Sequence, residues 1–172
     1  MKSTSNIFLV GMMGAGKTTV GRQLAQRLGK SFVDADQDIE QRTGVAVKVI
    51  FEIEGEAGFR KRESEALDRL TAMSDLVLAT GGGAVLDARN RQWLSERGYV
   101  IYLHAQARDL WMRTRNDKTR PLLQTDDPRA RIQSLYDVRD PLYRQVADLV
   151  VDTGRQGVGV LLNHLMQNLE AV

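Results

Sequence analysis

The chain has 172 residues, 42% of them apolar, and its 24 basic residues against 22 acidic ones leave a net charge of +2. This length and composition fit one ordinary domain with a sizeable core. The basic residues form no block of one sign, so the charge pattern of a general nucleic-acid or membrane binder is excluded. The absence of cysteine excludes disulfides, thiolate metal sites and cysteine nucleophiles. The opening apolar run is too short for a signal peptide and no stretch approaches a membrane span, so we expect a cytoplasmic protein, and a monomer by default.

Apolar runs of strand character alternate with amphipathic helical stretches along the chain, which is typical of a parallel sheet covered by helices on both faces. The predicted strands are Asn6–Val10, Ser31–Asp34, Asp75–Thr80, Tyr99–His104 and Leu149–Asp152. The predicted helices are Thr18–Leu28, Asp36–Thr43, Glu56–Met73, Asp87–Arg97, Ala107–Arg115, Pro128–Arg139 and Val158–Leu169. The sequence therefore predicts an α/β fold with a five-stranded parallel sheet.

The segment Gly11–Thr18, GMMGAGKT, follows the first predicted strand directly and opens the first helix, as a phosphate-binding P-loop requires. Backbone without Cβ atoms can wrap a diphosphate closely, and the helix adds free N–H groups and the positive end of its dipole. Lys17 would reach the β and γ phosphates, and the Thr18 hydroxyl would bind Mg²⁺. The alternative is a glycine turn that only joins strand to helix. The residues predicted to bind ATP here are Gly14, Ala15, Gly16, Lys17, Thr18 and Thr19.

Two carboxylates, Asp34 and Asp36, follow the second predicted strand. Ligands of open parallel sheets collect beyond the carboxyl ends of the strands, so both can face the phosphates. Asp34 could hold Mg²⁺ through water, and Asp36 could orient a substrate hydroxyl or accept its proton. The alternative for Asp36 is that it only caps the helix that follows.

Three consecutive glycines, Gly81, Gly82 and Gly83, end the third strand segment. They cost conformational entropy and contribute no packing, so a substrate group approaching the backbone closely would explain them. A tight turn usually needs only one glycine. Thr80 stands where P-loop ATPases keep a Walker-B aspartate, which favours a small-molecule kinase over a motor or transporter ATPase.

The segment Asn116–Asp127 is polar, carries Pro121 and shows neither helix nor strand periodicity. Long loops inside compact domains are commonly lids, and a surface excursion is the alternative. Arg120 in this loop could swing over the transferring phosphoryl group, as arginines supplied in cis do in other phosphotransferases.

Two further arginines stand in helical patterns, and their sequence context leaves their roles open. Arg60 can pair with Glu63 along one helix face, which on its own is more often a solvated salt bridge. Arg139 is expected to end its helix, where a cation also simply favours the dipole.

Six motifs in this order resemble those of the shikimate kinase family, and they run across almost the whole chain. After the P-loop come FVDADQDIE at 32–40 and GEAGFRKRE at 55–63. GGG at 81–83, RPLL at 120–123 and RDPLY at 139–143 follow. Met12 departs from the pattern at a place often held by proline, and Thr18 replaces the commoner serine while keeping its hydroxyl.

The resemblance implies transfer of the ATP γ-phosphoryl group to the 3-hydroxyl of shikimate, with Mg²⁺, in the pathway to chorismate and the aromatic amino acids. It implies a single P-loop kinase domain over 1–172, with a substrate-binding helical region at about 35–63 and a lid at about 113–127. The catalytic residues it implies are Lys17, Asp36 and Arg120. The residues it implies for shikimate are Asp36, Arg60, Gly81, Gly82, Gly83 and Arg139, with Phe51 and Phe59 lining the ring pocket.

The resemblance also assigns the rest of the nucleotide site. Arg120 would contact the ATP phosphates, while Arg113 and Arg155 would flank the adenine. Thr18 and, through water, Asp34 would hold Mg²⁺. The rival functions are another small kinase of this architecture, for gluconate or a nucleoside monophosphate, and a nucleotide-dependent switch without an acceptor.

Overall fold

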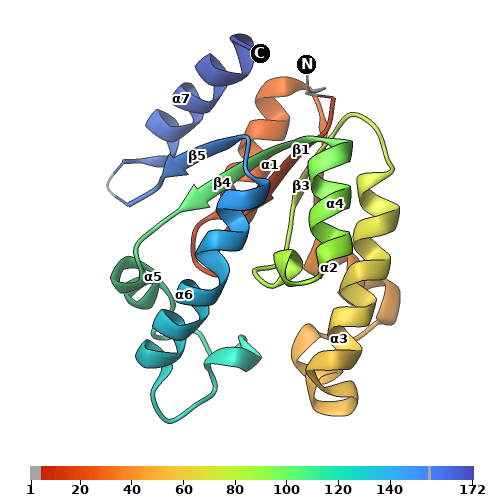
Figure 1. The fold of residues 1–172 in the computed structure, drawn as a ribbon, viewed down its shortest axis with the longest axis vertical. Coiled ribbons are helices and arrows are strands. Elements are labelled where there is room, and N and C mark those ends of the chain that lie inside the picture. Colours follow the sequence, from red (N-terminus) through yellow and green to blue (C-terminus); the bar gives the residue numbers. More distant parts are fainter. Residues whose placement is uncertain (1–4, 155) are drawn as a thin grey trace.

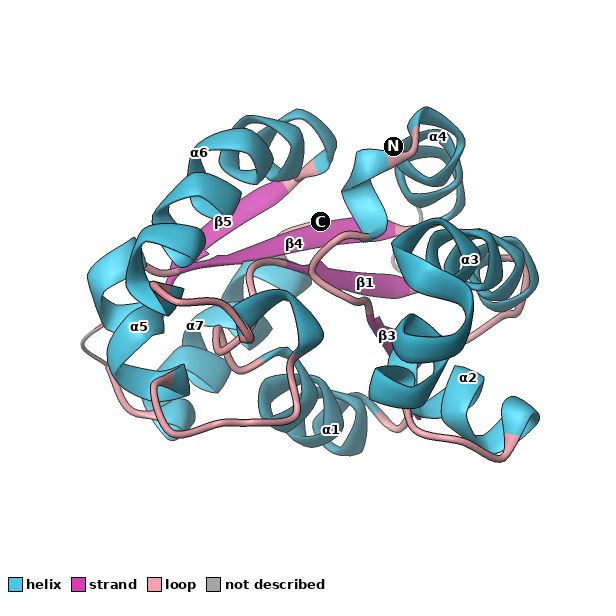
Figure 2. Cartoon of the chain, turned by 90° about the horizontal axis from the view of Figure 1, so that it is seen from below, coloured by secondary structure: helices cyan, strands magenta, loops and turns pink. Residues whose placement is uncertain are grey.

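The computed structural model describes residues 5–154 and 156–172. Its centre is a five-stranded, all-parallel sheet with the order β2-β3-β1-β4-β5 (Figures 1 and 2). The strands are β1 (Ile7–Val10), β2 (Ser31–Asp34), β3 (Leu76–Ala79), β4 (Tyr99–His104) and β5 (Leu149–Asp152). The predicted sheet is confirmed: β2, β4 and β5 have the predicted bounds, β1 begins one residue later, and β3 is one residue shorter at each end.

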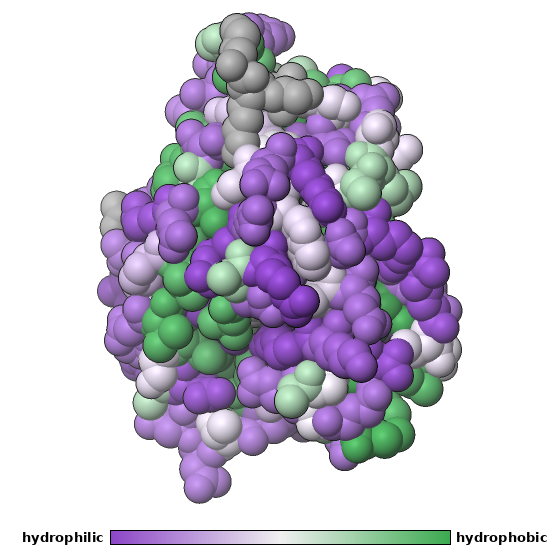
Figure 3. Space-filling model, turned by 45° about the vertical axis from the view of Figure 1, so that its right-hand side comes forward, coloured by the Kyte–Doolittle hydropathy of each residue, from purple (hydrophilic) through white to green (hydrophobic). Residues whose placement is uncertain are grey.

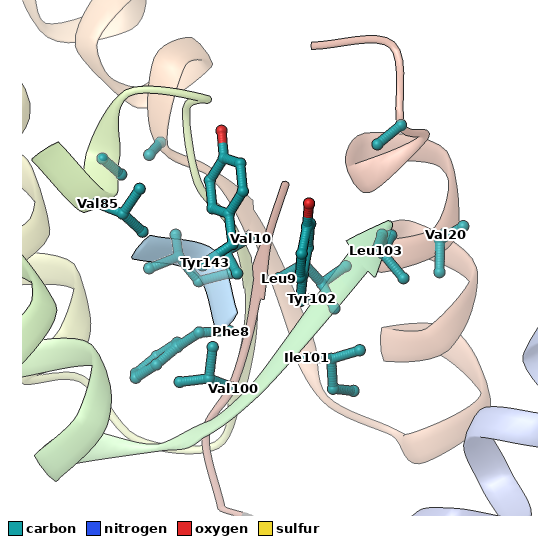
Figure 4. Packing of buried hydrophobic residues seen from close by; sticks show 14 of the residues in the cluster. Phe8, Leu9, Val10, Val20, Val85, Val100, Ile101, Tyr102, Leu103 and Tyr143 are labelled. Carbon is teal, nitrogen blue, oxygen red and sulfur yellow. The ribbon is translucent and has the colours of Figure 1, made fainter. Parts of the chain in front are cut away.

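The core lies around the central strand β1, whose four residues are each at most 1% exposed. A parallel strand with helices on both faces is buried on both faces, which is why IFLV reads as a continuous apolar run rather than an alternating one. Figure 4 shows Phe8 and Val100 on one side of this layer, with Tyr102 further along β4 and Tyr143 close to it.

Helices cover both faces of the sheet. Figure 2 shows α1 and α7 on one side and α4 and α6 on the other. The helices are α1 (Lys17–Leu28), α2 (Ala35–Thr43), α3 (Val47–Thr71), α4 (Ala88–Arg97), α5 (Ala107–Thr114), α6 (Pro128–Val146) and α7 (Val158–Glu170), with short 3-10 turns at Ala84–Leu86 and Pro121–Leu123. Within the described ranges, none of these helices has both the length and the apolar character that crossing a membrane requires.

Two helix predictions are wrong, and both errors concern residues near the site. Helix α3 begins at Val47 and consists of two helical parts, which meet in a kink at Gly55, where φ is 74°. Helix α6 runs past Arg139 and through Pro141 to Val146. Proline removes one helical hydrogen bond, but Tyr143 and Val146 beyond it are buried in the core and hold the helix there. Arg139 is therefore inside a helix and not at its end.

Candidate active site

The P-loop after β1 has the backbone that an anion site needs. Gly14 and Gly16 adopt φ values of 81° and 94°, which L residues rarely adopt. A Cβ on Gly11 would lie 2.6 Å from the carbonyl oxygen of Leu103, so the loop passes directly against β4. Helix α1 begins at Lys17, and no side chain caps its first N–H groups. Those donors are free to bind a phosphate.

The ammonium of Lys17 lies within the P-loop, where it donates to the carbonyl oxygens of Gly11 (2.5 Å) and Met12 (3.0 Å). Lys17 as a residue is only half-buried. Its ammonium is nevertheless desolvated, and this burial, with the positive charge of Arg120, lowers the pKa of Lys17 to about 8. A phosphate in the loop would favour the charged form, because an opposite charge nearby raises the pKa of an amine.

Asp34 connects the P-loop helix to the start of α2. The hydroxyl of Thr18 donates to Asp34 Oδ2 at 2.6 Å, and the amide of Gln37 donates to Asp34 Oδ1 at 3.0 Å. Asp34 is therefore the N-cap of α2. The alternative that Asp36 serves only as this cap is wrong, because Asp36 lies in the first turn of the helix.

Asp36 meets a second buried carboxylate at the glycine turn. A Cβ on Gly81 would lie 2.9 Å from Asp36 Oδ1 and 2.8 Å from Glu63 Oε2, so only glycine leaves room for both. In the described part of the chain, neither of these buried oxygens has a hydrogen-bond partner. Burial first, and then the negative charges of Glu63 and Asp34, raise the pKa of Asp36 to about 7. This carboxyl is thus poised to exchange a proton near neutral pH.

Arg60 lies against the last glycine of the turn. A Cβ on Gly83 would collide with its guanidinium. Arg60 Nη1 donates to Glu63 Oε1 at 3.0 Å, and Glu63 is only 1% exposed. The predicted pair exists, but it is not a solvated salt bridge, because Glu63 is buried. Glu56, about half-exposed, adds a longer contact of 3.4 Å.

Arg139 approaches the same turn from α6. It is 2% exposed, and a Cβ on Gly82 would lie 3.2 Å from Arg139 Nη1. Burial lowers the pKa of its guanidinium below the ordinary value, and the positive charge of Arg60 adds to this effect. Two guanidinium groups from different helices therefore meet successive glycines, Gly82 and Gly83.

The two predicted ring-pocket residues are in contact with each other. The ring centroids of Phe51 and Phe59 are 4.8 Å apart, with planes inclined by 35°. Phe59 is buried, and its ring centroid lies 5.3 Å from the Arg60 guanidinium carbon. The first part of α3, which the sequence did not predict as helix, brings Phe51 to this position.

The arginines predicted for the nucleotide are held by loop contacts. Arg120 Nε donates to Asp117 at 3.0 Å, and the Arg120 side chain is 39% exposed. Arg113 donates to the carbonyl oxygens of Gly14 (3.0 Å) and Thr153 (2.9 Å), so it joins the P-loop to the segment after β5. Arg155, the other predicted adenine contact, lies outside the described residues.

The structure places two further buried residues at the turn: Glu63, which the sequence predicts only as a partner of Arg60, and Tyr143, to which it gives no role. Glu63 faces Asp36 and holds Arg60. Tyr143 donates its hydroxyl hydrogen to the Gly82 carbonyl oxygen at 2.5 Å. Each is the last residue of a sequence motif, Glu63 of the one at 55–63 and Tyr143 of the one at 139–143. The spacing of Arg60 and Glu63 also predicts their pairing. The burial of Glu63, its position near Asp36 and the bond from Tyr143 to Gly82 cannot be read from a motif.

A P-loop, a carboxylate with a pKa near neutrality and two converging arginines at the carboxyl ends of a parallel sheet define a P-loop kinase for a small anionic acceptor. The shikimate kinase family model matches residues 13–170, and the chain belongs to this family. The shikimate kinase of Burkholderia lata is 57% identical, over 96% of this chain and 90% of the relative.

Solved structures agree with this assignment. The structure described as shikimate kinase from Acinetobacter baumannii in complex with shikimate matches with a TM-score of 0.95 and 47% identity, over 99% of this chain and 95% of that one. A gluconokinase from Sinorhizobium meliloti matches with a TM-score of 0.59 over 99% of this chain and 98% of that one. Its identity is 16%, so it shares the fold alone.

Proposed function

We propose that this chain transfers the γ-phosphoryl group of ATP to the 3-hydroxyl of shikimate, giving shikimate 3-phosphate and ADP on the route to the aromatic amino acids. Membership of the shikimate kinase family supports the reaction. The observation that carries the site assignment is the convergence of Arg60, Arg139 and Asp36 on the three glycines of one turn.

Arg60 and Arg139 bind the shikimate carboxylate in this proposal. Guanidinium groups present a planar fork of donors that matches a carboxylate, and hydrogen bonds to charged groups are worth roughly 1.5 to 3 kcal/mol each. Both side chains are already held within the chain. Arg60 is held by its bond to Glu63, and Arg139, which lies within α6, is held by its burial. Phe51 and Phe59 form the apolar wall against which the ring packs.

Asp36 orients the 3-hydroxyl and accepts its proton as the oxygen attacks the γ phosphorus. The backbone at Gly81–Gly83 holds the neighbouring hydroxyls. A raised pKa makes Asp36 a better proton acceptor than an ordinary carboxylate while leaving a useful ionised fraction at neutral pH. Phosphoryl transfer has a loose transition state, so placing the hydroxyl in line contributes more than the proton transfer itself.

The P-loop N–H groups, from Gly14 to Thr19, and Lys17 hold the ATP phosphates. Arg113 lies at the adenine end, where it already bridges Gly14 and Thr153. Residues 113–127 form a lid that brings Arg120 onto the phosphates. The lowered pKa of Lys17 supports this placement, because the charge of Arg120 contributes to it across the site.

Mg²⁺ fits the oxygen donors that Thr18 and Asp34 present. Hard cations take hydroxyl and carboxylate oxygens, and Mg²⁺ in kinases keeps waters and phosphate oxygens as its other ligands. The 2.6 Å bond between the Thr18 hydroxyl and Asp34 supports this, because it brings a hydroxyl that could bind the metal directly next to a carboxylate that could hold a bound water. When bound, Mg²⁺ would neutralise charge on the phosphates.

A cytoplasmic monomer of one P-loop kinase domain is part of the same proposal. Among the described residues, the most exposed apolar side chains are those of Ile53, Met112, Val138 and Val160, which lie on four different helices. Figure 3 shows a mainly hydrophilic face, with apolar groups toward its left side and at its lower right. Exposed apolar side chains on different helices are ordinary for a protein surface and do not by themselves indicate an interface.

The test is ADP release from Mg-ATP, measured by a coupled assay with shikimate, D-gluconate or a nucleoside monophosphate as acceptor, together with detection of shikimate 3-phosphate. Of the three acceptors, we expect strong turnover only with shikimate. Turnover with gluconate or a nucleotide, but not with shikimate, would contradict the proposed acceptor. ATP binding without turnover on any of these acceptors would favour the nucleotide switch.

A further inference from the structure

Tyr143 contacts two of the groups that the proposed function assigns to the acceptor. Its hydroxyl lies 2.5 Å from the Gly82 carbonyl oxygen, and the Arg139 guanidinium lies beside the same glycine. A Cβ on Gly82 would lie 3.7 Å from this hydroxyl and 3.2 Å from Arg139 Nη1, so all three groups meet at one point. We infer that Tyr143 is a positioning residue, which fixes the Gly82–Gly83 peptide and the Arg139 guanidinium for shikimate binding. This inference rests on the proposed acceptor site.

The direction of the hydrogen bond follows from the two groups that make it. A carbonyl oxygen only accepts, so the single phenolic hydrogen of Tyr143 is donated to Gly82. The phenolic oxygen is then left to accept from the Arg139 guanidinium, which carries donors only. Burial raises the pKa of Tyr143 above its ordinary value, which keeps the phenol protonated and able to donate. One hydroxyl thus connects α6 to the glycine turn in a fixed orientation.

The glycine turn needs such a contact, because its own sequence does not select one peptide orientation. Residues 81–84 form a turn closed by the Ala84 amide and the Gly81 carbonyl at 3.1 Å. Gly83, the second central residue, has φ −90° and ψ 6°, which are type I values. A flip of the Gly82–Gly83 peptide would give a type II turn, which requires φ of about +80° at this position. Glycine adopts that angle without steric cost.

Tyr143 opposes this flip. In a trans peptide the carbonyl and the N–H point in opposite directions, so holding the Gly82 oxygen toward Tyr143 turns the Gly83 N–H away from it. A flipped peptide would lose the bond to Tyr143 and leave a buried phenol hydrogen without its acceptor, which costs free energy. The turn therefore presents its amide to the acceptor in one orientation although three glycines leave its backbone free.

The ring of Tyr143 is itself held in place. It is fully buried and packs on Tyr102, with ring centroids 4.9 Å apart (Figure 4). The Tyr102 hydroxyl donates to Asp140 at 2.8 Å, and Asp140 also accepts from Arg144 on the outer side of α6. The two tyrosines are thus neighbours with equal chemistry, but the Tyr143 hydroxyl bonds to the glycine turn and the Tyr102 hydroxyl bonds to Asp140. Tyr102 provides the matched control.

The experiment compares Tyr143→Phe with Tyr102→Phe, each of which removes one buried hydroxyl from the same ring pair. For Tyr143→Phe we expect the shikimate KM to rise about tenfold, as the loss of one hydrogen bond predicts, with the ATP KM unchanged. For Tyr102→Phe we expect Tm to fall by about as much as in Tyr143→Phe, with the shikimate KM unchanged. An unchanged shikimate KM in Tyr143→Phe, or equal increases in both variants, would overturn the inference.

A second measurement does not depend on the variants folding. In a crystal structure of the unaltered chain with shikimate, the Tyr143–Gly82 bond should persist and Gly83 should keep φ near −90°. A flipped Gly82–Gly83 peptide in that complex would overturn the inference. Failure of the proposed acceptor is distinguishable, because the unaltered chain would then not turn over shikimate at all.

Discussion

The glycine turn at 81–83 and the loop at 116–127 both lie beside arginine side chains of the site, but these arginines are held differently. Arg139, at the turn, is 2% exposed and lies against Gly82. Arg120, in the loop, is 39% exposed and held by Asp117, only three residues away. Local contacts of an exposed loop are easily exchanged, whereas contacts between buried helices are not.

This difference separates two tasks. The proposed acceptor side, made of the glycine turn with Asp36, Arg60, Glu63 and Arg139, is held by buried contacts within the chain. The proposed nucleotide side, made of the P-loop with Arg113 and Arg120, depends on contacts that a loop can change. We therefore expect the rigid side to select the acceptor. Its buried groups cannot move to restore a hydrogen bond that a wrong acceptor fails to make.

The largest effect is expected from Asp36→Asn, which removes the proton acceptor without touching the P-loop. We expect kcat to fall about 10² to 10⁴-fold, as is typical for the loss of a general base, while ATP binding measured by calorimetry persists. Asp38→Asn is the control, since Asp38 lies on the same helix but pairs with Arg69 and Arg42. Near-normal turnover of Asp36→Asn would remove this residue from the mechanism.

Arg139→Lys tests whether the acceptor side depends on the shape of the guanidinium. A point charge cannot replace the bidentate fork, so the shikimate KM should rise roughly 10 to 100-fold and the ATP KM much less. Steady-state kinetics with each substrate varied measures both. Arg144→Lys, on the same helix but paired with Asp140 at the surface, should behave as the unaltered chain does. Equal effects of Arg139→Lys on both substrates would instead indicate a structural role.

Gly81→Ala tests how tightly the acceptor side is packed. The added Cβ would lie within 2.9 Å of oxygens of both Asp36 and Glu63, so one carboxylate has to move. Overpacking of this kind costs about 1 to 3 kcal/mol, and we expect kcat/KM for shikimate to fall roughly tenfold or more. Gly157→Ala is the control, because a Cβ there has nothing within 4 Å. Full activity of Gly81→Ala would show that the carboxylates adapt.

The pH dependence of kcat/KM should report the ionisation of Asp36. Asp36 faces the negative charges of Glu63 and Asp34 and the positive charges of Lys17 and Arg60, and its pKa is raised to about 7. Because the ionised form accepts the proton, kcat/KM for shikimate should fall as the pH drops below about 7.

Glu63→Gln removes one negative charge beside Asp36, so the pKa of Asp36 should fall and the acid limb should move to lower pH. Glu56→Gln also alters a contact of Arg60, but Glu56 is about half-exposed and should leave the limb in place. A pH profile of kcat/KM for all three proteins is the measurement. An acid limb that does not move in Glu63→Gln would contradict the coupling between the two carboxylates.

The sequence was sufficient for the sheet and for the order of the site motifs, because local patterns determine both. Apolar runs identified the strands. Glycines mark the P-loop because its backbone has positive φ angles, which residues with a side chain rarely adopt. The first part of α3 was missed because Gly55 interrupts the helical pattern. Arg139 was placed at a helix end because Pro141 ordinarily stops a helix, and only packing beyond it shows otherwise.

The long-range contacts of the site could not be predicted in the same way. Tyr143 and Gly82 are 61 residues apart in the sequence, and nothing local to either residue indicates that they meet. The approach of Glu63 and Asp36 to the same glycine, Gly81, likewise depends on how α3 packs against α2. Such contacts decide the pKa of the carboxylate and the orientation of the turn, so the mechanism needs the structure even where the motif is recognisable.

The most direct test of the rigid, carboxylate-binding acceptor side compares shikimate with the analogue in which a hydroxymethyl group replaces its carboxylate. Two charged hydrogen-bonding partners, at roughly 1.5 to 3 kcal/mol each, predict that kcat/KM falls at least about 10²-fold for the analogue, with the ATP KM unchanged. Comparable turnover of the two compounds would contradict the account, because Arg60 and Arg139 would then not select the acceptor.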